Sequence, residues 1–261
     1  MLALYHFAEA ICAQKVRLAL AEKGMPWESR DCVGPALRDP EYLKLNPSGV
    51  VPTLVHDDKV LTESRIISEY VAEAFDGPVL LPSNPHGRYR ARYWTKQIDD
   101  SLHLNVFILT FAGGARDLFL KMPPEVRAVS LPGLRDPIKR RISNELLDQG
   151  WESPLVASSV DRFRRLVNDM ENCLAQSTYL GGSGYSLADA DYTAYINRLA
   201  DLGFEGLWAG KPGVQDWWAR MRQRASYQVA IADWTELQDS QRYARFRERY
   251  ADSVRMLIAG A

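Results

Sequence analysis

The fold of this chain is indicated by Val51-Pro52-Thr53-Leu54 and, ten residues later, Thr62-Glu63-Ser64-Arg65-Ile66-Ile67. An apolar strand interrupted by proline, a polar turn, a second short strand and a serine-led helix predict a small binding corner. The N–H groups and positive dipole end of a helix that opens at Glu63 and Ser64 favour a carboxylate ligand. Taken alone, the stretch also fits a hairpin followed by a serine N-cap, and only about 5–6% of X-Pro bonds are cis in folded proteins.

Length and composition are those of a soluble globular protein with one large or two modest domains: 261 residues, 46% hydrophobic and 25% charged. A net charge of −1 argues against nucleic acid as the main partner. No apolar stretch approaches a membrane span or an uninterrupted signal core. The three cysteines, Cys12, Cys32 and Cys173, form neither a disulfide framework nor a metal pattern. We therefore expect a cytoplasmic protein with free thiols and no metal.

Residues 1–78 alternate strand and helix signals. Strands are predicted at residues 2–7, 26–32, 50–55 and 59–61, and helices at 12–23, 40–45 and 63–75. The order β-α-β-α-β-β-α predicts a layered α/β domain. Prolines and glycines at 79–87 predict a linker, and residues 88–261 read as an all-helical domain.

Within residues 88–261, long helices are predicted at 88–110, 155–175, 187–202 and 214–224, with a less regular, proline-rich stretch between the first two. Ser186-Leu187-Ala188-Asp189 has the form of a capping box, for which we expect a structural role. Phe107 and Phe111 are candidates to line an apolar substrate pocket, with core packing as the alternative. The tail at 241–257 is amphipathic, and its pattern fits both a cover over a pocket and a packed helix.

The combination of the α/β order, Val51-Pro52, Glu63-Ser64 and Ser186-Leu187-Ala188-Asp189 resembles the cytosolic glutathione transferases over the whole chain. The resemblance implies a thioredoxin-like domain with a cis proline, followed by a helical domain that supplies a pocket for a hydrophobic aromatic co-substrate. It also implies a homodimer and glutathione as co-substrate. Val51 and Pro52 would hold the cysteinyl part of glutathione, and Glu63 and Ser64 its γ-glutamyl end.

The family's activating residue lies in the loop before the first helix, where this chain has Ala10 and Ala13 in place of serine, and Cys12 between them. A thiol at a helix N-terminus has a lowered pKa when exposed. Ile11-Cys12-Ala13-Gln14-Lys15 is similar to the cysteine loop of the tetrachlorohydroquinone reductive dehalogenases, and further segments resemble the bacterial β-etherases. Three roles for Cys12 stay open: a redox nucleophile, a donor to the glutathione sulfur, and a small packing residue.

The expected reaction is attack by glutathione thiolate on a hydrophobic aromatic or β-aryl ether electrophile. The first alternative is a thiol reductase or reductive dehalogenase that uses Cys12 as its catalytic residue. The second is a non-catalytic interaction protein, which the absence of an activating serine keeps open. His6, at the end of the first strand, and His103, on the long helix, are candidate pocket acids, and for each a structural role is the alternative.

Overall fold

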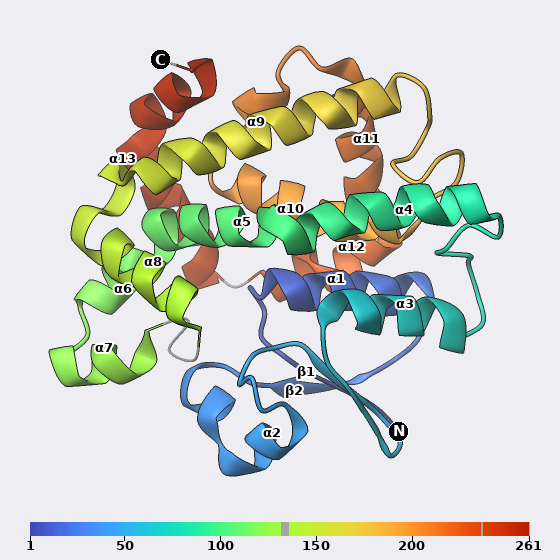
Figure 1. Cartoon of the computed structure of the whole chain (residues 1–261), viewed down its shortest axis with the longest axis horizontal. Coiled ribbons are helices and arrows are strands. Elements are labelled where there is room, and N and C mark those ends of the chain that lie inside the picture. Colours follow the sequence, from blue (N-terminus) through green and yellow to red (C-terminus); the bar gives the residue numbers. More distant parts are fainter. Residues whose placement is uncertain (132–135, 236, 261) are drawn as a thin grey trace.

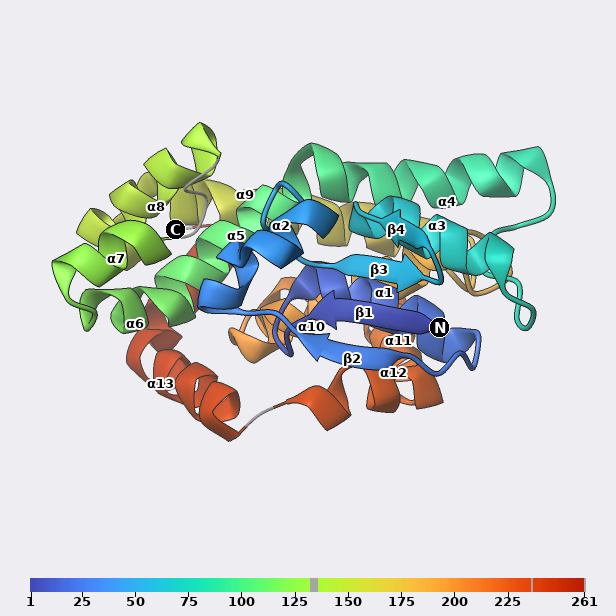
Figure 2. The same ribbon diagram turned by 90° about the horizontal axis from the view of Figure 1, so that it is seen from below.

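A four-stranded sheet covered by helices forms the first part of the chain (Figures 1 and 2). The structure is a computed structural model and describes residues 1–131, 136–235 and 237–260. In the described residues the strand order is β2-β1-β3-β4. β1 and β2 are parallel, and the other two pairings are antiparallel. The strands are β1 (Leu2–His6), β2 (Glu28–Asp31), β3 (Thr53–His56) and β4 (Lys59–Leu61).

The helices of this part are α1 (Ile11–Glu22), the short 3-10 helix η1 (Gly34–Arg38), α2 (Pro40–Leu45) and α3 (Ser64–Ala74). α1 and α3 pack side by side on one face of the sheet, while α2 lies toward the other face (Figure 2). Their shared core includes Leu4, Val16, Leu54 and Ile67, none of which is more than 1% exposed. The predicted β-α-β-α-β-β-α order is therefore confirmed.

The regular elements among the described residues of the second part are helices, connected by turns and loops (Figure 1). Its first half contains α4 (Pro85–Gln97), α5 (His103–Thr110), α6 (Arg116–Leu120), α7 (Pro124–Ser130), α8 (Pro137–Gln149) and α9 (Pro154–Leu174), with the 3-10 helix η4 (Gly150–Glu152). Its second half contains α10 (Leu187–Asp201), α11 (Pro212–Arg222), α12 (Ala225–Ala230) and α13 (Leu237–Ala259), with the 3-10 helices η5 (Glu205–Trp208) and η6 (Ala232–Trp234).

The long predicted helix at 88–110 is part of a helical run from Pro85 to Leu120 that contains two π-helical segments, η2 (Ile98–Leu102) and η3 (Phe111–Ala115). π-helical segments change the register of the residues that follow and occur frequently at functional sites. The expectation of an irregular stretch after residue 110 was wrong where the chain is described, since α6, α7 and α8 lie there. Pro124 and Pro137 occupy first-turn positions of these helices, where proline is tolerated. Residues 132–135, which belong to the same predicted stretch, lie outside the described residues.

α10 is the central helix of the second part and packs directly on α1 of the first (Figure 1). Residues 187–199 are all buried, and the predicted capping box is present at the N-terminus of this helix. The Asp189 carboxylate accepts hydrogen bonds from the Ser186 and Leu180 backbone N–H groups and from the Trp217 indole. Asp189 thus fixes the beginning of α10, and with it the residues that α10 presents to the first part.

The tail forms α13, which packs along the helical domain through buried Phe246 and Val254. It also reaches the loop before α1, because the Tyr243 hydroxyl donates to the Glu9 carboxylate at 2.6 Å and Arg242 forms an ion pair with the same group. Among the described residues, no helix has the length and apolarity needed to cross a membrane.

Candidate active site

Cys12 is the second residue of α1 and is half-buried where the two parts of the chain meet. The N-cap of α1 is Ala10, whose side chain makes no capping hydrogen bond. N–H groups in the first turn of a helix lack intrahelical acceptors and carry partial positive charge. The sulfur of Cys12 therefore lies at a position that favours the thiolate form.

His103 comes from the helical domain and faces this sulfur. Its Nδ1 lies 3.6 Å from Cys12 Sγ and 3.1 Å from the hydroxyl of Tyr195 on α10. His103 is the first residue of α5, directly after the π-helical segment η2. Since that segment shifts the helical register, it helps to set the direction in which the imidazole points.

Two hydroxyl groups and one ammonium group complete the surroundings of the sulfur. The hydroxyls of Ser64 and Tyr195 lie close enough to interact with Cys12, and the interaction with Ser64 lowers the pKa of the thiol. Lys15 lies one turn after Cys12 on the same face of α1, and its fully buried Nζ donates to Ser64 Oγ at 3.3 Å. Four elements, α1, α3, α5 and α10, thus bring polar hydrogens or positive charge to one sulfur.

The pKa of Cys12 follows from these contacts. Burial alone would raise the pKa of the thiol, but the charge and hydrogen bond of His103 and the charge of Lys15 outweigh it and lower the pKa from 9.0 to about 6. With such a pKa most of the Cys12 thiol is ionised at pH 7. Burial raises the pKa of the Tyr195 hydroxyl well above its usual value, so this group remains a donor.

Lys15 is held in its charged form by Asp191 of α10. Nζ lies 3.3 Å from Asp191 Oδ2, and the two side chains are 0% and 1% exposed. Burial would lower the pKa of Lys15, but Asp191 and Cys12 raise it. Burial raises the pKa of Asp191 to about 6, against the influence of Lys15. The ion pair connects the first domain to the second directly beside Cys12.

Of the residues predicted to hold glutathione, Ser64 lies beside this site, where its Oγ accepts a hydrogen bond from Lys15. The Val51-Pro52 bond is cis. α3 begins at Ser64, one residue later than predicted, because Glu63 has a φ of 68°. A non-glycine residue in the left-handed region costs about 1–3 kcal/mol and is found disproportionately at functional sites. The exposed carboxylate of Glu63 and the half-buried Ser64 accordingly mark the end of α3 that points toward Cys12.

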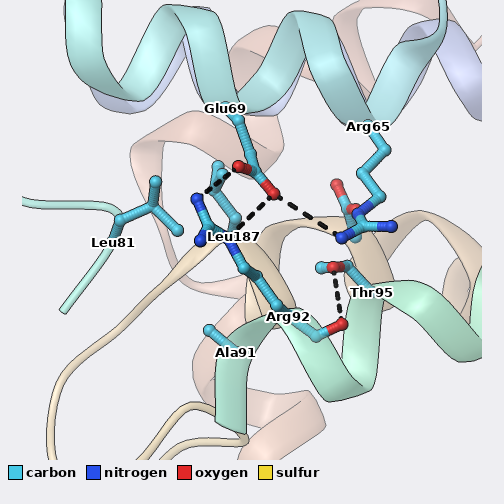
Figure 3. A pocket seen from close by; sticks show the side chains of 8 residues that line it. Arg65, Glu69, Leu81, Ala91, Arg92, Thr95 and Leu187 are labelled. Carbon is cyan, nitrogen blue, oxygen red and sulfur yellow. Dashed lines mark hydrogen bonds and ion pairs between the residues drawn. The ribbon is translucent and has the colours of Figure 1, made fainter. Parts of the chain in front are cut away.

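A small pocket between α3, α4 and α10 adjoins the Lys15–Asp191 pair, and Asp191 is one of its lining residues. Figure 3 shows Glu69 of α3 directed toward Arg92 of α4 and Arg65 of its own helix. The Arg92–Glu69 bridge measures 2.8 Å and the Arg65–Glu69 pair 3.8 Å. Charged side chains that pair across the boundary make this pocket a junction between the domains.

Of the other candidate pocket residues, His6 and Phe111 are buried and Phe107 is half-buried. His6 is 1% exposed, and its ring nitrogens contact Ser29 Oγ at 2.9 Å and Arg17 Nη1 at 3.0 Å, an arrangement that favours a structural role. Phe111 is 1% exposed and stacks on Phe119, which favours core packing. Phe107 is half-buried, with its ring centroid 5.8 Å from that of Phe111.

Sequence reasoning did not find Lys15, Asp191 and Tyr195, and it left His103 without a partner. The spacing of Cys12 and Lys15, three residues apart on one helix, was a usable signal for a cation beside the thiol. No comparable signal existed for Tyr195, since tyrosines in an apolar helix are ordinarily core residues.

The fold and this boundary site define a class: a thioredoxin-like domain joined to a helical domain, with a thiol at the start of the first helix. The glutathione S-transferase N-terminal domain matches residues 4–79, and the C-terminal domain of the same family matches residues 122–225. Protein LigF of a Sphingobium strain is 33% identical in an alignment 243 positions long, which covers 85% of this chain and 90% of LigF. The chain belongs to the glutathione S-transferase family.

Further comparisons concern one more relative and two solved structures. The tetrachloro-p-hydroquinone reductive dehalogenase of Sphingobium chlorophenolicum is 28% identical over 237 residues, covering 87% of this chain and 94% of that protein. The crystal structure of the β-etherase LigF superposes with a TM-score of 0.72 at 30% identity, over 89% of this chain and 99% of LigF. Glutathione transferase F7 of Populus trichocarpa reaches the same TM-score at 23% identity and shows the shared fold.

Proposed function

We propose that this chain is a glutathione-dependent enzyme in which the thiolate of Cys12 removes glutathione from an aromatic glutathione conjugate. The observation that supports this proposal is the contact between Cys12 Sγ and His103 Nδ1 at 3.6 Å, with Lys15 one turn away. These groups lower the pKa of Cys12 to about 6, so the nucleophile is present at neutral pH. A merely packed cysteine has no need of such partners.

The reaction proceeds in two balanced steps. The Cys12 thiolate attacks the glutathione sulfur of the conjugate, an S–S bond forms, and the aryl carbon–sulfur bond breaks. The carbon keeps the electron pair and takes up a proton, so the arene is reduced while Cys12 and glutathione become a mixed disulfide. A second glutathione thiolate then attacks the glutathione sulfur of this disulfide, which releases oxidised glutathione and restores Cys12.

Glutathione binding at Val51, Pro52, Glu63 and Ser64 is part of the proposal. The position of Ser64 supports it, because this hydroxyl contacts both Lys15 and Cys12 and therefore lies beside the reacting sulfur. A hydrophobic aromatic co-substrate would enter from the helical domain, near Phe107 and His103. The reductive dehalogenase among the relatives acts on a chlorinated hydroquinone, which suggests hydroquinone conjugates as a first substrate class.

A second candidate function is direct transfer of glutathione thiolate to an aromatic or β-aryl ether electrophile, with a phenol as leaving group. The 33% identity to LigF, whose crystal structure is described as a β-etherase, favours it. In this reaction Cys12 would orient the glutathione sulfur without forming a bond to it. A non-catalytic interaction role is the remaining alternative, and it predicts no turnover with either substrate.

One experiment separates these functions. The purified protein and its Cys12→Ser variant are incubated with glutathione and either a chlorohydroquinone–glutathione conjugate or a model β-aryl ether, with Cys173→Ser as the matched control. We expect free hydroquinone and oxidised glutathione in equal amounts from the wild type and the control, and loss of both products with Cys12→Ser. Thioether and phenol formed equally by the wild type and Cys12→Ser would instead support direct transfer. Absence of all products would contradict both enzymatic functions.

Members of the family are usually dimeric, and we propose that this chain forms a homodimer through α3 and α4. Ile66 of α3 and Tyr89 and Tyr93 of α4 are 56%, 62% and 56% exposed. Large apolar side chains that gather on one face of a protein mark interaction surfaces. A two-fold axis would place the same face of each copy against the other.

A further inference from the structure

We propose that His103 and Tyr195 act as a proton switch that ionises Cys12: His103 Nδ1 takes the thiol proton, and the Tyr195 hydroxyl then turns its hydrogen from that nitrogen to the sulfur. The inference rests on the proposed function of Cys12 and assigns two further residues to it. It follows from an unusual juxtaposition, in which one ring nitrogen contacts both a hydroxyl and a sulfur.

The two protonation states of His103 Nδ1 give two different arrangements of hydrogen bonds. Nδ1 carries either a lone pair or a proton. With a lone pair, it accepts from the Tyr195 hydroxyl at 3.1 Å. With a proton, it donates to Cys12 Sγ at 3.6 Å, and the Tyr195 hydrogen loses its acceptor on the ring. Because the Tyr195 hydroxyl and Cys12 Sγ both lie beside Nδ1, the new thiolate offers a replacement acceptor.

Burial confines the Tyr195 hydroxyl to partners inside the protein. Tyr195 is fully buried, so its hydroxyl cannot exchange partners freely with solvent, whereas His103 and Cys12 are half-buried. Burial also raises the pKa of Tyr195 well above its usual range, so the hydroxyl cannot lose its proton to His103 in place of the thiol. The proton on Nδ1 therefore comes from Cys12, whose thiol is the remaining acid in direct contact with that nitrogen among the described residues.

The other charged groups near the sulfur support the ionised state without supplying a base. Lys15 on α1 is cationic and favours the thiolate, while Ser64 on α3 donates a hydrogen bond. Asp191 on α10 and Asp99 in η2 both act on Lys15, and Asp191 is paired with it at 3.3 Å. The switch also supplies the proton that the proposed reaction consumes. His103 gives the proton taken from Cys12 to the aryl carbon, and it then takes another from the thiol of the second glutathione.

The test uses alkylation of Cys12 by iodoacetamide between pH 4 and 10, read by peptide mass spectrometry, because this measurement requires no substrate. His103→Asn keeps an amide N–H near the sulfur but cannot accept the proton. We expect its alkylation midpoint to rise and its rate at pH 7 to fall at least tenfold, with a rate near the wild-type value at pH 10. Tyr195→Phe should move the midpoint in the same direction by a smaller amount, with a three- to tenfold slower rate at pH 7.

Two variants serve as matched controls. His86→Asn replaces a histidine whose ring stacks on Tyr89 in α4, and Tyr192→Phe removes a hydroxyl that donates to the Trp94 carbonyl. Both should retain the wild-type midpoint. An unchanged midpoint in His103→Asn would overturn the inference, as would a rate reduced equally at every pH, which indicates altered access. If the midpoints move as expected while the wild type releases no arene from the conjugate, the proposed function fails and the switch stands.

Discussion

Replacement of Lys15 by methionine tests the electrostatic core of the site. Lys15 and Asp191 are 0% and 1% exposed and their charged atoms lie 3.3 Å apart. Removal of one partner of a buried ion pair costs about 3–5 kcal/mol, because the other charge stays buried without compensation. Folded domains have unfolding free energies of about 5–15 kcal/mol, so this loss is a large fraction of the total.

The destabilisation caused by Lys15→Met depends on pH through the titration of Asp191. Burial already raises the pKa of Asp191 from 3.8 to about 6, and Lys15 opposes that rise. Without Lys15 the folded pKa rises further above the unfolded value. A carboxyl group with a raised folded pKa stabilises the fold below its unfolded pKa, and this stability is lost as the pH rises through the folded pKa. The destabilisation of Lys15→Met should therefore be greater at pH 8 than at pH 5.

Urea titration at both pH values measures the free energy of unfolding. The double variant Lys15→Met, Asp191→Asn removes both charges and should recover most of the lost stability. Lys44→Met is the control, since Lys44 and its partner Glu41 are 69% and 78% exposed and such a pair contributes little. The same Lys15→Met variant should raise the pKa of Cys12. If the single and double variants lose equal stability, the destabilisation does not come from an uncompensated Asp191 charge.

Two further predictions concern parts of the fold outside the sulfur site. Burial and the nearby Arg17 lower the pKa of His6 from 6.5 to about 4, a difference that corresponds to about 3 kcal/mol. The unfolded chain binds the His6 proton more readily, so the wild type should lose stability as the pH falls from 6.5 to 4. Urea titrations should show a weaker dependence of the unfolding free energy on pH for His6→Gln, and an equal dependence would refute the account. Tyr89→Glu should shift the sedimenting species from dimer to monomer, while Leu118→Glu on the exposed surface of α6 should not, and a monomeric wild type would refute the proposed dimer.

Much of the fold was predictable because its signals are local. The strand and helix order of the first domain follows from apolar periodicity and from glycine and proline positions, and the structure confirms it. The capping box before α10 was equally readable, since its two side chains satisfy backbone groups only three residues apart. The helices α6 to α8 were missed because prolines at first-turn positions look like breaks in a sequence.

The sequence by itself determined that a cysteine stands at the start of the first helix, with a lysine one turn later and no serine at Ala10 or Ala13. It could not determine the state of that cysteine. His103 is 91 residues away along the chain and reaches the sulfur only because the π-helical segment and the packing of α10 on α1 bring it there. Electrostatic interactions change over a few ångströms, and burial decides their strength. The chemistry of Cys12 is thus a property of the interface between the domains, which exists only in the tertiary structure.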